Sequence, residues 1–219
     1  MENYILRSVS LVFISVMIGC STDPEIKKED SFRYLTEADL KKTDFPAATQ
    51  FKCPEDTQTV YGWSCPTNNV LASANAEGSS WQEIKCNTDF VYTNICVDKY
   101  EYPGVHSVPE KVSLEEAKNI CMARDGHLCS QQEWRNSCTG NIKSPYGMSN
   151  FKRPEECNFD KPRKSGFNPG CRNVHGVVDM IGNGAEWQTE GTIGLTSCLD
   201  ARAATENKNS FRCCYNPTK

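Results

Sequence analysis

Residues 112–134 read VSLEEAKNICMARDGHLCSQQEW, and this stretch predicts two adjacent helices. Ser113 and Glu116 form a capping box, in which each side chain accepts a hydrogen bond from the backbone amide of the other. A helix is therefore expected from there to about Arg124, with Gly126 as its stop. One face of this helix carries three apolar side chains: Leu114, Ala117 and Cys121.

A second capping box follows, formed by Ser130 and Glu133. Its helix carries Trp134 and Cys138, which face the same side because they are four residues apart.

Strands are expected on either side of this helical region. Residues 90–102 are rich in β-branched and aromatic side chains and end at Pro103-Gly104, which is typical of a strand that closes in a turn. Residues 211–215 predict a final strand, and turns and loops fill most of the chain after Gly140. The pattern favours a loop-rich α+β fold.

The N-terminus predicts export. The apolar run of residues 8–18 is too short to span a membrane and is followed by Gly19-Cys20, as in a bacterial lipoprotein signal. We expect residues 1–19 to be a signal peptide, Cys20 to be acylated and residues 20–50 to be a polar tether. The protein would then be anchored to a bacterial membrane, the outer one. An ordinary secretory signal, with Cys20 free or paired, is the alternative.

The cysteines predict disulfide bonds. The chain has 13 cysteines, which leaves an even set once Cys20 is lipidated, and no Cys-x-x-Cys or His cluster suggests zinc. Residues 51–89, with Cys53, Cys65 and Cys86, predict a small lead-in made of hairpins.

The charge excludes some partners. The net charge is −4, and no basic cluster stands out beyond short lysine pairs. Nucleic acid is therefore not expected as a partner, and neither are anionic lipid head groups.

An ordered series of motifs runs through residues 90–217. It comprises VDKYEYP at 97–103, CMARDGHLCSQQEW at 121–134, SCTG at 137–140, PYG at 145–147, CN at 157–158, GVVDMIGN at 176–183, EW at 186–187 and FRCC at 211–214. In this order the motifs resemble the sulfatase-modifying factor family, the formylglycine-generating-enzyme-like domains. The resemblance implies an α+β fold related to C-type lectins, loop-rich and stapled by disulfides.

The two cysteines that bind copper in the family's enzymes have no matching pair in this sequence. The family's enzymes oxidise a substrate cysteine to formylglycine with copper held by two cysteines five residues apart. Residues 188–210, where that pair would lie, contain only Cys198. Because soft thiolates select Cu(I), copper is not expected, and no catalytic residue is assigned. Recruitment of Cys129 or Cys214 into the role is the alternative.

The resemblance also implies disulfide partners. Two bridges carry over as Cys121–Cys213 and Cys138–Cys198. We further expect Cys157–Cys171 as a local clasp. The adjacent Cys213 and Cys214 are expected to reach different partners.

Calcium is the one cofactor that the resemblance suggests. Asp179, Gly182, Gly184 and Glu186 match a family calcium site in which side-chain and backbone oxygens wrap one ion. A turn in which the two carboxylates only cap backbone amides is the alternative. The family's second site would begin at Asn158-Phe159, but it lacks an acidic partner and is not assigned.

Two further residue pairs are interpreted as structural. Trp134 and Trp187 could form a sugar-stacking platform, but both are expected in the core. Asp98 and Glu101 are three apart on a predicted strand, so they face opposite sides and should not form an acid–base pair.

The sequence thus predicts a lipid-anchored exported protein with a domain that lacks oxidase activity. It would act as a binding or structural module for an unknown envelope protein or glycan. The alternatives are a formylglycine-generating oxidoreductase and an accessory factor for an envelope enzyme.

Overall fold

The structure, a computed structural model, describes residues 51–64, 70–74, 82–86, 91–140, 144–147, 149 and 152–218. All of them belong to the second of two units of the chain, Ser31–Lys219. The predicted signal peptide, Cys20 and the tether lie outside the described residues, as does Cys65.

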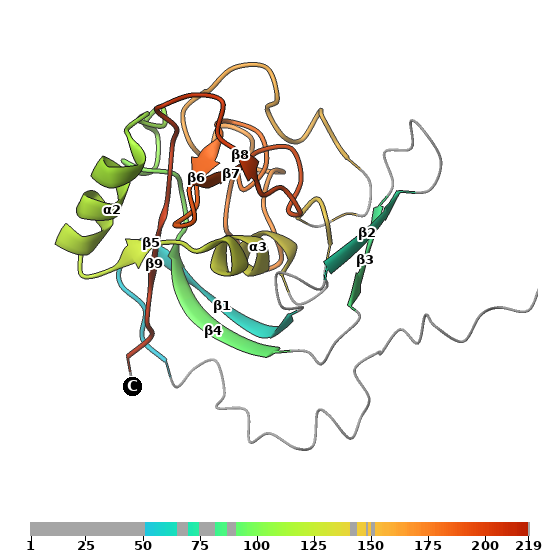
Figure 1. The fold of residues 1–219 in the computed structure, drawn as a ribbon, viewed down its shortest axis with the longest axis horizontal. Coiled ribbons are helices and arrows are strands. Elements are labelled where there is room, and N and C mark those ends of the chain that lie inside the picture. Colours follow the sequence, from blue (N-terminus) through green and yellow to red (C-terminus); the bar gives the residue numbers. More distant parts are fainter. Residues whose placement is uncertain are drawn as a thin grey trace, which may run out of the picture. The chain divides into compact units, whose positions relative to one another are not determined.

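The fold is α+β, with two helices and small antiparallel sheets among the described residues (Figure 1). One sheet has the order β1 (Thr57–Ser64), β4 (Val91–Asp98), β9 (Cys213–Tyr215), β5 (His127–Leu128). A second joins β6 (Glu186–Trp187), β7 (Thr192–Gly194) and β8 (Arg202–Ala203). The strands β2 (Val70–Ala74) and β3 (Gln82–Cys86) pair with each other. The predicted fold class is confirmed at this level.

Both predicted helices are present. Helix α2 spans Leu114–Ala123 and α3 spans Gln131–Thr139, and both capping boxes are formed. The end of α2 differs in detail from the prediction, because Asp125 rather than Gly126 adopts the left-handed conformation, with φ 58°. Gly126 is required for another reason. A Cβ there would collide with the Tyr215 ring and the Cys214 carbonyl of β9.

The predicted lead-in is partly built into the main sheet. Strand β1 pairs with β4 along its whole length, from Thr57 opposite Asp98 to Ser64 opposite Val91. The disulfide Cys53–Cys96 fastens the same two segments. The sheet therefore extends across the boundary predicted at residue 90, because β4 needs a partner on the side away from β9.

Strands β4 and β9 are both shorter than the strands predicted at residues 90–102 and 211–215. Strand β4 ends at Asp98, where its pairing with β1 ends. Strand β9 begins only at Cys213, since residues 213–215 are the ones that pair with β4 and β5. The preceding Arg212 leaves the strand pattern and points its side chain into the interior, where it is fully buried.

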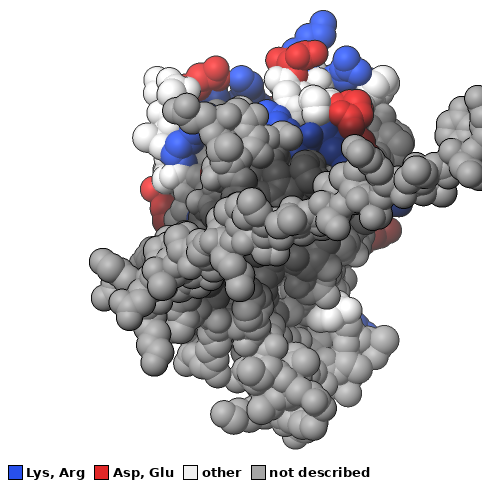
Figure 2. Space-filling view, turned by 90° about the vertical axis from the view of Figure 1, so that its right-hand side faces the viewer, with Lys and Arg blue, Asp and Glu red and all other residues white. Residues whose placement is uncertain are grey.

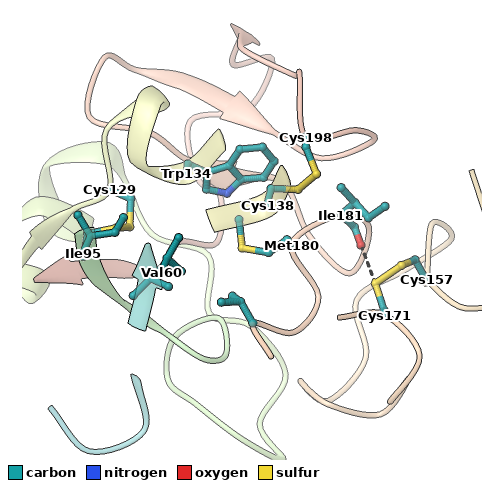
Figure 3. Close-up of a cluster of buried hydrophobic side chains, with 13 residues drawn as sticks. Val60, Ile95, Cys129, Trp134, Cys138, Cys157, Cys171, Met180, Ile181 and Cys198 are labelled. Atoms are coloured by element: carbon teal, nitrogen blue, oxygen red, sulfur yellow. Dashed lines mark hydrogen bonds between the residues drawn. A yellow bond between two sulfur atoms is a disulfide. The ribbon is translucent and has the colours of Figure 1, made fainter. Parts of the chain in front are cut away.

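Two apolar clusters form the core. Trp134 lies in one, beside the Cys138–Cys198 disulfide (Figure 3). Trp187 and Phe211 lie in the other. Both tryptophans are buried, at 0% and 5% exposure, which confirms that they are core residues rather than a surface platform.

Candidate functional site

Arg212 is the centre of a buried polar cluster that links four parts of the fold. Its Nε lies 3.0 and 2.9 Å from the two oxygens of Glu186, and its Nη2 also contacts that carboxylate. Its Nη1 donates to the Asp98 carbonyl, and Nη2 also donates to the Val178 carbonyl, each at 3.1 Å. Trp134 Nε1 donates to Glu186 Oε2 at 2.5 Å. Both oxygens of the Glu186 carboxylate are thus engaged by protein donors.

Two more acids lie in this cluster. Glu101 is fully buried and accepts a hydrogen bond from Asn183 Nδ2 at 2.6 Å, and Ser210 Oγ lies 3.0 Å from its other oxygen. Burial raises the pKa of Glu101 well above its usual range, and the charge of Glu186 raises it further, while Arg212 acts in the opposite direction. The single positive charge of Arg212 therefore cannot neutralise both Glu186 and Glu101.

Asp179 is the third acid. Its Oδ2 accepts a hydrogen bond from the Gly166 amide at 2.8 Å. Burial raises its pKa to about 6, although that hydrogen bond and Arg212 oppose the shift. Asp179 itself has a positive φ of 54°, so the turn that begins with it is held in a conformation that few side chains adopt.

These contacts do not suit the calcium ion expected at Asp179, Gly182, Gly184 and Glu186. Calcium needs several free oxygens around one point. Both Glu186 oxygens are instead occupied by Arg212 and Trp134, and the Gly182 carbonyl accepts from Gly184 N–H. No group of three or more His, Cys, Asp or Glu in the described part of the chain could hold a metal ion. The guanidinium supplies the positive charge here.

We predict that calcium does not stabilise the protein. Adding calcium after chelation should leave the thermal unfolding midpoint unchanged, because both oxygens of the Glu186 carboxylate are already engaged by Arg212 and Trp134. Differential scanning calorimetry with and without calcium measures this, with magnesium as the control. A calcium-specific rise in the midpoint would show that the loop rearranges to bind the ion.

An open pocket of about 340 Å³ lies over this cluster. Its walls come from residues 158–162, the turn at 183–185, strands β7 and β8, and the segment 205–209, together with Lys111. The floor includes Gly184, where a Cβ would meet Ser210 Oγ and Glu101 Oε1. Only a glycine leaves room there, so the pocket floor rests directly on the buried Glu101 carboxyl.

Asn183 connects the pocket wall to the buried cluster. Its N–H donates to the Asn158 carbonyl at 2.6 Å, and its Oδ1 accepts from the Arg163 amide at 2.8 Å. Its Nδ2 is the donor to Glu101. One buried side chain thus holds the 158–163 loop in place, and the pocket wall is preorganised.

Disulfides take up the candidate thiols. The ten cysteines whose side chains are described form five bridges, which include the expected pairs Cys121–Cys213, Cys138–Cys198 and Cys157–Cys171. Cys129 pairs with Cys214, so neither of the residues considered as a substitute copper ligand is a free thiol here. Cys213 and Cys214 reach different partners.

Asp98 and Glu101 are engaged separately. Asp98 accepts two hydrogen bonds from Arg124, at 2.7 and 2.8 Å, while Glu101 lies in the Arg212 cluster. They form no acid–base pair, although the chain has already left the strand at Glu101.

Sequence reasoning missed the role of Arg212. A charged residue between the buried Phe211 and Cys213 signals a buried ion pair, but it does not identify the partner.

No protein-family model and no curated protein matches this chain. Within the described residues, no helix is both long enough and apolar enough to cross a membrane. The pocket and the disulfide pairing are the features of the structure that bear on function.

Proposed function

We propose that this chain is a lipid-anchored exported protein with a formylglycine-generating-enzyme-like domain, related in fold to C-type lectins, that lacks oxidase activity and acts as a binding module. Its motif series supports the family, and its α+β, disulfide-rich structure is compatible with it. The pocket over the Arg212 cluster is the binding site that we assign to it.

The pairing of the cysteines carries this proposal. Formylglycine generation in the family needs copper between two thiolates. Cys198, the single cysteine of residues 188–210, is fully buried and bonded to Cys138. A disulfide sulfur carries no charge and cannot replace a thiolate ligand. The ten cysteines whose side chains are described therefore offer no thiolate pair for Cu(I).

The pocket supports a binding role. Ligand sites are usually concave, of about 300–1,000 Å³, and combine apolar walls with a few polar groups. This pocket has apolar side chains in its walls, among them Phe159, Ile193 and Leu195, next to charged ones. Its wall is fixed by buried hydrogen bonds, so little ordering is needed when a ligand enters.

We predict that the oxidised protein neither binds stoichiometric Cu(I) nor converts a sulfatase-motif cysteine peptide to formylglycine. Copper titration and mass spectrometry of the peptide measure the two results. The reduced protein is the control, since reduction exposes thiols that bind copper without the native geometry. Copper-dependent conversion by the oxidised protein would establish the oxidoreductase instead.

We also predict a mature N-terminus at acylated Cys20. Mass spectrometry of the protein extracted from membranes should show the lipid-modified cysteine, and Cys20→Ala should release the protein or stall its processing. Cys65→Ala is the matched control, because it removes a cysteine outside the signal and should leave the anchor intact. An unacylated protein cleaved elsewhere would refute the anchor.

A further inference from the structure

We infer that the pocket binds an organic anion, namely a small molecule with an apolar body and a carboxylate or similar oxyanion. This inference rests on the proposed binding function and specifies its ligand. Three features carry it: the charge of the pocket's rim, the apolar wall beside that charge, and the fixed position of the wall.

Two cations at the pocket have no ion-pair partner among the described residues. Lys161 and Arg202 both line it and are exposed. Neither belongs to a salt bridge of the described chain. Lys111 differs, because its Nζ is held 2.9 Å from Glu206. Asp160 is the one lining acid that no such salt bridge includes, so the unpaired charges leave a positive excess.

The positive excess at the pocket is opposite in sign to the net charge of the chain. The protein carries a net charge of −4, yet the residues that line the pocket include three cations and two acids. Charge of one sign in a concave site concentrates ligands of the opposite sign. On the described part of the face in Figure 2, Lys and Arg are mixed with Asp and Glu. Because the chain as a whole is acidic, the excess at the pocket suits a small anion rather than a long polyanion.

The wall beside the cations is apolar. Phe159, Ile193 and Leu195 line the pocket, and one Phe159 face is occupied by Lys152, whose Nζ lies 4.2 Å from the ring centroid. A purely ionic ligand would leave this wall in contact with water. A ligand with an apolar body would cover it while its charged end reached Lys161 or Arg202.

The matched probes are naphthoate and its neutral amide, naphthamide. They have nearly the same shape and differ in charge. NMR titration of the isotope-labelled oxidised protein should show saturable shifts of the Phe159, Ile193 and Leu195 amides with naphthoate. The affinity for naphthamide should be several-fold weaker, and the naphthoate affinity should fall as salt is added.

Single substitutions test which charged side chains of the pocket contribute to naphthoate binding. Lys161→Gln and Arg202→Gln should each weaken naphthoate binding by about two- to fivefold, the range for exposed ion pairs, and Asp160→Asn should strengthen it. Lys164→Gln and Arg172→Gln are the matched controls, because they remove exposed cations that do not line the pocket. Both should bind naphthoate like the unmodified protein.

The outcomes separate the two proposals. Equal affinity for both probes at the pocket would overturn the anion preference while supporting the pocket as a binding site. An absence of saturable shifts, or shifts at other residues, would overturn the pocket assignment altogether. Neither result bears on the absence of oxidase activity, which the copper and peptide assay decides independently.

Discussion

Replacing Arg212 with Gln is expected to lower the free energy of unfolding by about 3–5 kcal/mol, as when one partner of a buried ion pair is removed. Arg212 and Glu186 are 0% and 1% exposed, so water cannot replace the lost guanidinium. The Glu186 carboxylate would remain buried next to Glu101 and Asp179. Urea denaturation of the oxidised variant measures the loss.

Arg153→Gln is the matched control. Arg153 pairs with Glu156 at 2.8 Å, but both side chains are well exposed, at 49% and 37%. Its replacement should cost less than about 1 kcal/mol, because water and salt screen the pair. Similar losses for the two variants would contradict the assignment of Arg212 as the charge that stabilises the cluster.

The loss caused by Arg212→Gln should also depend on pH. The pKa of Asp179 is raised from 3.8 to about 6 in the folded protein. An acid with a raised pKa binds protons on folding, so its contribution to stability is greatest below the unfolded value and declines as the pH rises through the folded value. Arg212 lowers the pKa of both Asp179 and Glu101, so its removal strengthens this dependence. The loss should be smaller at about pH 5 than at about pH 7. An equal loss of unfolding free energy at the two pH values would contradict the inference that Arg212 compensates the buried carboxylates.

Removal of the Cys121–Cys213 bridge by the double substitution Cys121→Ala and Cys213→Ala should cost about 3 kcal/mol in chain entropy, and the lost packing of the two sulfurs adds to this. The two cysteines are 92 residues apart and join α2 to β9. Because the Cys129–Cys214 bridge still joins the neighbouring positions, the loop that Cys121–Cys213 closes in addition is only about ten residues long, and this length sets the entropy gained by the unfolded chain. Both sulfurs are also fully buried, so their loss removes packing. The free energy of unfolding in urea measures the effect, and both cysteines are replaced so that no unpaired thiol remains.

The control is the matching double substitution of Cys157 and Cys171. This bridge closes a separation of only 14 residues, and its loss should cost about 3 kcal/mol. The two entropy terms are then similar, so the difference between the two variants compares the packing of the two bridges. A loss far from about 3 kcal/mol for both variants would contradict the chain-entropy account.

The local features of the fold could be predicted from the sequence. Each capping box is a contact within four residues, so Ser113 and Ser130 locate the helix starts without knowledge of the rest of the chain. The burial of Trp134 and Trp187 also agrees with the prediction. The predicted end of the first helix was less accurate. Asp125, and not Gly126, adopts the left-handed conformation, while Gly126 is required because β9 packs closely against it.

The site was predicted only in part. The turn at residues 179–186 was identified as important, but its carboxylates were expected to face a cation from solution. In the structure Glu186 pairs with Arg212, 26 positions after it, and Asp179 accepts from the Gly166 amide. The pocket was not predicted, since its walls come from segments that share no motif and meet only in the folded chain.

Features with local causes can be read from the amino-acid sequence: two capped helices, turns and a loop-rich α+β class. Other features depend on the folded chain: β1 pairs with β4, Glu186 pairs with Arg212, and Gly184 lies over Glu101. The reason is physical. Helix caps depend on hydrogen bonds between neighbours, whereas a buried charge is stabilised by whichever partner the folded chain brings within reach, and that partner is set by packing over the whole domain.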